Sequence, residues 1–141
     1  MIIEDENFKQ KIVDEILSLM ENKNIIWKAL NENNNDFMAN VKYTYKPNIK
    51  RNEIKTISFG YRVCCFGHSP RIIIYDYAYK NGITDTTDLP SIEVYDKNTK
   101  NSIIFNLLSK IEENVEKEKQ IKDEKLLDKF TWYLNAKKKR N

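Results

Sequence analysis

The sequence predicts an α+β protein in which one helix precedes an antiparallel meander of about five strands and a long helix, or a helix pair, follows. Apolar residues recur at helical spacing over residues 7–22. Alternating segments divided by turn residues then extend to residue 96. After Pro90 neither glycine nor proline interrupts the chain, and helical spacing returns. A chain of 141 residues is typical of one domain, here residues 1–141.

The first helix is predicted from an apolar stripe. Phe8, Ile12, Ile16 and Met20 follow one another at four-residue spacing. The acidic residues 4–6 precede this stripe, where the positive end of the helix dipole favours negative charge. The stretch "NKN" at residues 22–24 is a plausible end. We therefore expect Ile12 and Ile16 to be buried.

Strands are predicted from segments in which apolar and polar residues alternate. The five segments are residues 25–30, 37–46, 57–65, 71–79 and 91–96. Alternation puts Tyr43, Tyr45 and Tyr61 on the same dry faces as Val41, Phe59 and Val63. We expect Phe59 and Val63 to be buried and these tyrosines to lie at the core edge. For Tyr75 and Tyr77 the pattern allows either face.

The C-terminal third contains two apolar stripes with a charged stretch, residues 116–125, between them. The first stripe includes Leu108, which we expect to be buried, and the second runs from Leu126 to Leu134. One helix through both would be about 50 Å long. Its far end would lack a core and would pack on a second copy, as a homodimer through the C-terminal helix. The alternative is a hinge near Asp123. Residues 136–141 are expected to form a frayed basic tail.

Both cysteines and the single histidine lie in the stretch "CCFGHSPR" at residues 64–71. A structural zinc site needs four ligands, and the chain has no further Cys or His beyond Cys64, Cys65 and His68. Adjacent strand residues point to opposite faces, so the two thiols diverge. We interpret "FGHSPR" at residues 66–71 as a hairpin loop with an exposed His68, and Cys65 before it as a residue that packs in the core. We expect no metal, no cofactor and no catalytic residues, although a Cys–His enzyme remains an alternative.

Positive charge is concentrated in the predicted sheet. Residues 37–75 contain seven basic residues and one acidic residue, whereas the whole chain has a net charge of +3. Such a region attracts an anionic macromolecule, either an acidic protein or a nucleic-acid complex. The predicted partner-binding residues are Lys42, Lys46, Lys50, Arg51, Arg62, His68 and Arg71. Tyrosines are interleaved with these cations, so an alternative is that this surface stacks nucleic-acid bases.

No phosphate-binding loop or hydrolase motif is present in the sequence. We therefore expect a small non-enzymatic binding protein. No signal peptide or apolar run long enough to span a bilayer is present, so we expect a cytoplasmic location and no membrane contact. The abundance of Lys, Ile and Asn indicates a low-GC genome, its phage or another mobile element. An anti-defence inhibitor, such as an anti-CRISPR protein, is one form of this hypothesis. The alternatives are direct nucleic-acid or nucleotide binding and an immunity- or chaperone-type partner protein.

Overall fold

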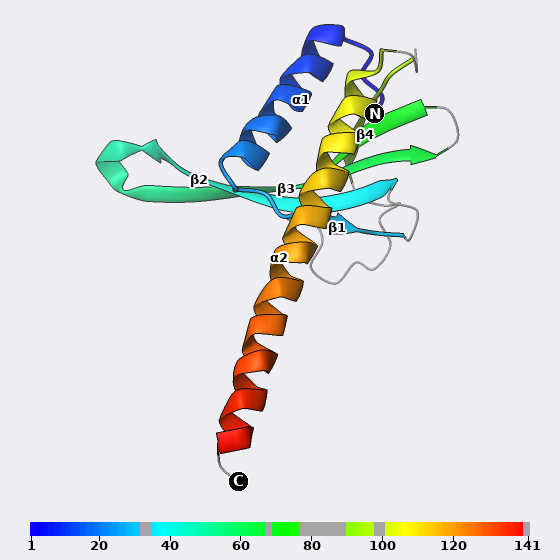
Figure 1. Ribbon diagram of the computed structural model, residues 1–141. Helices are drawn as coiled ribbons and strands as arrows, with labels where there is room; N and C mark the ends of the chain where they lie inside the picture. Colours follow the sequence, from blue (N-terminus) through cyan, green and yellow to red (C-terminus); the bar gives the residue numbers. More distant parts are fainter. Residues whose placement is uncertain (32–34, 67–68, 77–89, 98–100, 140–141) are drawn as a thin grey trace.

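The computed structural model describes residues 1–31, 35–66, 69–76, 90–97 and 101–139. It confirms the α+β class. Helix α1 (Glu6–Glu21) is followed by a five-stranded antiparallel sheet, and helix α2 (Ile103–Lys139) ends the described chain. Figure 1 shows both helices on the same face of the sheet.

The sheet is a meander whose spatial order follows the chain. Its strands are β1 (Lys28–Ala29), β2 (Asp36–Asn48), β3 (Glu53–Phe66), β4 (Ser69–Asp76) and β5 (Ser91–Tyr95). The first strand is shorter than predicted, because Ile25 and Trp27 pack into the core instead of pairing with β2. At the other edge, the backbone of Ile2 bridges Glu93 of β5.

The core lies between the sheet and the two helices. Its fully buried side chains come from both layers, as Ile16 of α1, Phe37 of β2 and Ile111 of α2 illustrate. Asp5 caps α1, because its carboxylate accepts the backbone N–H groups of Asn7 and Phe8. The predicted burial of Ile12, Ile16, Val63 and Leu108 is confirmed. We call this sandwich of sheet and helices the body of the protein.

A buried ionic contact joins the two helices to the end of the sheet. The carboxylate of Asp96, just after β5, pairs with the ammonium of Lys9 in α1. It also accepts the hydroxyl of Ser102 at 2.5 Å and the backbone N–H of Ile104 at 3.1 Å, at the start of α2. Negative charge is favourable at this end of a helix. Asp96 therefore holds both helices to the same strand.

Helix α2 extends far beyond the body (Figure 1). It is one continuous helix of 37 residues, which corresponds to about 55 Å. Its buried residues end at Ile111, and from residue 116 to 139 every side chain but that of Ala136 is exposed. The hinge predicted as an alternative near Asp123 is therefore wrong. Residues 136–139, predicted to be frayed, are helical.

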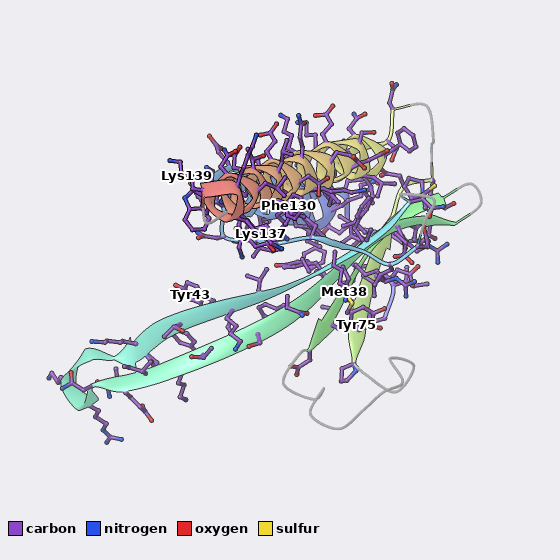
Figure 2. All side chains as sticks on the ribbon, turned by 60° about the horizontal axis from the view of Figure 1, so that its bottom comes forward. Met38, Tyr43, Tyr75, Phe130, Lys137 and Lys139 are labelled. Atoms are coloured by element: carbon purple, nitrogen blue, oxygen red, sulfur yellow. The ribbon has the colours of Figure 1, made fainter. Side chains whose placement is uncertain are left out.

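The β2–β3 hairpin forms a second protrusion, which Figure 2 shows reaching past the helices. We call residues 40–58 the arm. The alternation within the arm is as predicted, but no helix covers its apolar face there. Phe59, at the base of the arm, is consequently 36% exposed and Tyr43 is 60% exposed. The predicted burial of Phe59 is wrong, and of the three tyrosines Tyr43, Tyr45 and Tyr61 only Tyr61 is buried.

Candidate partner-binding arm

The arm is a regular two-stranded ribbon closed by a short turn. Residues 40–45 of β2 pair in register with residues 55–60 of β3, and the register shifts before the turn. A single turn of 3₁₀ helix (Ile49–Arg51) reverses the chain, with Asn48 accepting the backbone N–H of Lys50 at 3.1 Å. Asn52 then adopts a left-handed φ of 49°, which asparagine tolerates better than most residues. The two asparagines that flank the 3₁₀ turn thus stabilise it locally.

Five cations surround this ribbon, and Glu53 is its only acidic residue. All five are exposed, and none forms an ion pair within the described part of the chain. They are Lys42, Lys46, Lys50, Arg51 and Lys55. Because no described carboxylate pairs with them, their field is directed to solvent, where it attracts anions.

An apolar row follows one face of the ribbon. Val41 pairs with Phe59, and Tyr43 pairs with Ile57, so these four side chains share the face that points toward the helices. Ile57 is 40% exposed. The rings of Tyr43 and Tyr45 stack with centroids 5.7 Å apart. At the base of the row, residues of α1 such as Leu19 help to line a hollow of about 650 Å³.

The remaining predicted binding residues do not join the arm. Arg62 donates two hydrogen bonds, of 2.9 and 2.7 Å, to the buried Asp36. Hydrogen bonding to Asp36 raises the pKa of Arg62 above its usual range. Arg71 pairs with Glu93 at 2.9 Å. The structure therefore groups Lys42, Lys46, Lys50 and Arg51 on the arm and neutralises Arg62 and Arg71 on the body. His68 lies outside the described residues.

The two cysteines face opposite sides of the sheet, as expected. Cys65 packs against the core, which confirms its predicted role, while Cys64 is buried on the face without helices. Burial, together with the nearby carboxylate of Asp36, raises the pKa of the Cys64 thiol to about 11. A thiol with this pKa is protonated at neutral pH, and the thiolate is the nucleophilic form. This argues against Cys64 as a catalytic nucleophile. The described residues contain no group of three His, Cys, Asp or Glu side chains that could hold a metal ion.

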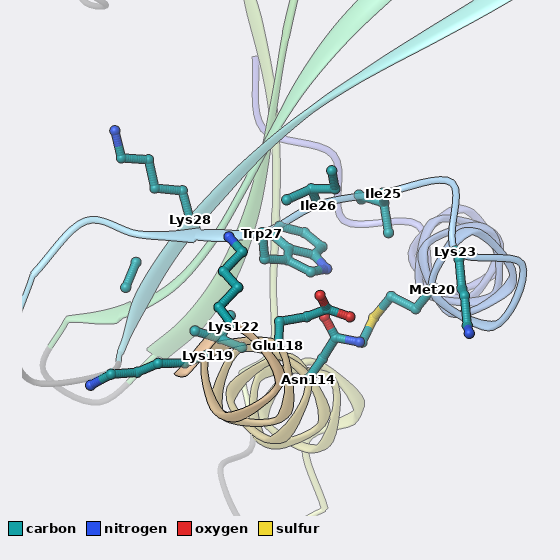
Figure 3. Close-up of a pocket in the computed structure, with 12 residues that line it drawn as sticks. Met20, Lys23, Ile25, Ile26, Trp27, Lys28, Asn114, Glu118, Lys119 and Lys122 are labelled. Atoms are coloured by element: carbon teal, nitrogen blue, oxygen red, sulfur yellow. The ribbon is translucent and has the colours of Figure 1, made fainter. Parts of the chain in front are cut away.

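A separate groove lies between the segment before β1 and the middle of α2. It has a volume of about 530 Å³, and the indole of Trp27 lies in its centre (Figure 3). The indole nitrogen of Trp27 is buried and has no hydrogen-bond partner in the part of the chain that the structure describes. Four lysines line the groove: Lys23, Lys28, Lys119 and Lys122. Sequence reasoning missed this groove because its lysines come from segments about 90 residues apart, which no local pattern connects.

Neither the fold nor the arm leads to a known relative. No family model, no curated protein and no solved structure matches this chain. The helices in the described ranges include none that is long and apolar enough to cross a bilayer. Function must therefore be argued from the surfaces themselves.

Proposed function

We propose that this protein is a small non-enzymatic binding protein that engages an acidic protein partner through the arm. The observation that carries the proposal is that one protruding ribbon combines an exposed apolar row with cations that pair with no described carboxylate. The cations Lys42, Lys46 and Lys50 form no ion pair with any residue that the structure describes. Their contact with the partner therefore breaks no ion pair among the described residues.

The apolar row favours a protein over a nucleic acid as the partner. Protein interfaces combine an apolar centre, enriched in aromatic residues, with a polar rim. Tyr43, Ile57 and Phe59 supply such a centre, and the lysines of the arm supply the rim. Binding through phosphates depends chiefly on cations and would not require this row. Inhibition of a host nucleic-acid-handling machine, including an anti-CRISPR role, is one specific form of the proposal. It is supported by the small size of the chain and by its abundance of Lys, Ile and Asn, whose codons are AT-rich.

Charge reversal on the arm tests the proposal. Partner proteins captured on the immobilised chain are identified, purified and titrated by calorimetry against the parent and two triple variants. The arm variant carries Lys42→Glu, Lys46→Glu and Lys50→Glu. The control variant carries Lys11→Glu, Lys110→Glu and Lys117→Glu, which changes the net charge equally at exposed positions outside the arm.

We expect the arm variant to weaken binding at least about tenfold, and the control to change it less than about threefold. A further variant, Phe59→Ser, should also weaken binding if the apolar row is buried at the interface. Equal affinity of the arm variant and the parent for the purified partner would refute the proposal. A 30-base-pair duplex that binds the arm with a steep salt dependence would instead assign direct nucleic-acid binding, since a two-stranded ribbon fits the major groove.

The groove at Trp27 favours a second candidate function, the binding of a small anion such as a nucleotide. Its four lysines outnumber its one carboxylate, that of Glu118, so the groove would attract phosphates. Its buried indole N–H also finds no acceptor among the described residues. The variant Trp132→Phe leaves Trp27 as the single tryptophan, so its fluorescence reports on the groove. A saturable change on titration with ATP, abolished by Lys119→Glu, would support this function. Unchanged fluorescence up to millimolar ATP would exclude it.

A further inference from the structure

The far half of α2 exposes an apolar face that no described residue of the body covers. Its large side chains are between 46% and 64% exposed. They are Leu126, Leu127, Phe130, Tyr133 and Leu134. Spacings of three and four residues place them on one side of the helix, and the rings of Phe130 and Tyr133 touch, with centroids 5.8 Å apart. Ile121 and Trp132 are also exposed but lie on the other side of the helix.

This face is symmetric about its own centre. Leu126 and Leu134 lie equally far from Phe130 along the helix, and so do Leu127 and Tyr133. If a second copy of α2 ran antiparallel with Phe130 opposite Phe130, every large apolar residue of the face would meet another one. A two-fold interface requires such self-complementarity.

Charged residues close the two ends of the same face. Asp123 and Lys137 lie equally far from Phe130, on the side that carries the apolar residues. Lys137 already lies over the ring of Tyr133, with its ammonium 5.8 Å from the ring centroid. Neither Asp123 nor Lys137 forms an ion pair within the described residues. An antiparallel pair would bring Asp123 of each copy against Lys137 of the other.

We propose that two copies of this protein associate through an antiparallel pairing of their α2 helices, centred on Phe130. This pairing is independent of the function proposed for the arm. The length of the helix fits it, because Lys139 of one copy lies opposite Ile121 of the other, beyond Ile111, the last buried residue of α2. The pairing therefore places the two bodies at opposite ends of the shared helix pair. A parallel pair would instead place Asp123 against Asp123 and Lys137 against Lys137.

The dimer would present two arms at a distance from each other. A partner with two acidic sites could then bind both arms at once. The rigid helix pair, rather than a flexible linker, would set the effective concentration of the second arm at the second site.

Sedimentation equilibrium over a range of micromolar concentrations tests the pairing. We expect the parent to dimerise and Phe130→Ala to raise the dissociation constant at least about tenfold, since each substitution acts twice in a symmetric interface. Trp132→Ala is the matched control, because Trp132 is 70% exposed on the other side of the helix, and it should change the constant less than about threefold. Both sites are exposed, so circular dichroism should show the same folded protein in each case. If the parent stays monomeric at a concentration of about 100 micromolar, its dissociation constant is well above that value and the proposal is overturned.

Charge exchange tests the direction of the helices. Asp123→Lys and Lys137→Asp should each weaken the dimer, because each places like charges together at both ends. The double variant with both substitutions should restore the affinity of the parent. If the single variants match the parent, or if the double variant is no tighter than the singles, the antiparallel arrangement is wrong.

Discussion

Removal of the Asp96 carboxylate should destabilise the whole fold. In the variant Asp96→Asn, the ammonium of Lys9 keeps only the exposed Glu6, at 2.7 Å, as an anionic partner. The side chains of Lys9 and Asp96 are both 7% exposed, so the pair is almost fully shielded from water. Removing one partner of a buried pair costs about 3–5 kcal/mol where no counter-charge remains. Because the exposed Glu6 remains beside Lys9, we expect a loss at the lower end of this range, about 3 kcal/mol.

A loss of this size is a large part of the total free energy of unfolding, which is about 5–15 kcal/mol for proteins of this kind. Each kcal/mol corresponds to about 2–4 °C in Tm for a chain of about 150 residues. We therefore expect Tm to fall by about 10 °C. The double variant Lys9→Met/Asp96→Asn should recover part of this loss, because it no longer buries an ammonium that has lost its buried partner.

Thermal unfolding followed by circular dichroism measures these differences. The matched control is Lys97→Met, which removes the exposed pair of Lys97 with Glu4 at 3.5 Å and should cost less than about 1 kcal/mol. A loss below about 1 kcal/mol for Asp96→Asn, or a double variant as unstable as the sum of the singles, would refute this reasoning.

The same pair predicts how stability depends on pH. Burial alone would raise the Asp96 pKa, but the hydrogen bonds from Lys9, Ser102 and Ile104 outweigh it and lower the pKa. A carboxyl group with a lowered pKa in the folded state stabilises the fold above its unfolded pKa of about 3.9, and this stabilisation is lost as the pH falls through the folded pKa. Below about pH 4 the advantage of the parent over Asp96→Asn should therefore shrink. A constant difference from pH 7 to pH 2 would contradict this.

Three further predictions concern the core and the thiols. Ile16→Ala and Leu108→Ala should each lower the free energy of unfolding, measured in urea, by about 2–5 kcal/mol. Phe59→Ala should lower it by less than about 1.5 kcal/mol. Equal losses would mean that the base of the arm belongs to the core. Cys64 should react with iodoacetamide at pH 8 far more slowly in the folded protein than after unfolding, because its pKa is raised to about 11, and rapid labelling of Cys64 in the folded protein would contradict its burial. Protein purified without chelator should contain no stoichiometric zinc, and elemental analysis that finds about one zinc per chain, lost in His68→Ala, would overturn this prediction.

The body could be predicted from sequence because its apolar residues follow the periods of its elements. Ile12 and Ile16 lie on one helix face, and Val63 alternates correctly, so burial followed from spacing. Phe59 obeys the same alternation but is exposed, because alternation defines the face of a strand and not the extent of the layer that covers it. The short length of β1 has a similar cause. Trp27 packs into the core instead of pairing with β2, and no local sequence pattern predicts this.

The candidate site was predictable only in part. The excess of cations over residues 37–75 pointed to the arm, and Lys42, Lys46, Lys50 and Arg51 do gather there. The counter-charges Asp36 and Glu93, which neutralise Arg62 and Arg71, come from neighbouring strands through register. A count of charges along the chain does not show which residues of neighbouring strands lie side by side. It therefore gave the paired Arg62 and Arg71 the same weight as the lysines of the arm.

The exposed apolar residues of this protein lie mainly on its two protrusions, and this separates folding from binding. Soluble monomers rarely expose contiguous apolar patches without a partner for them. Tyr43 and Ile57 on the arm, and Phe130 on α2, contribute little to the core that Ile16 and Ile111 form. Substitutions on the protrusions should therefore change affinity or assembly at nearly constant stability, whereas substitutions around Asp96 should change stability first. Because the arm and the far half of α2 extend from the body in different directions (Figure 1), their effects on stability should also add. A combined variant, Lys42→Glu with Phe130→Ala, whose loss of stability exceeds the sum of the single losses would show that the two surfaces are coupled through the body.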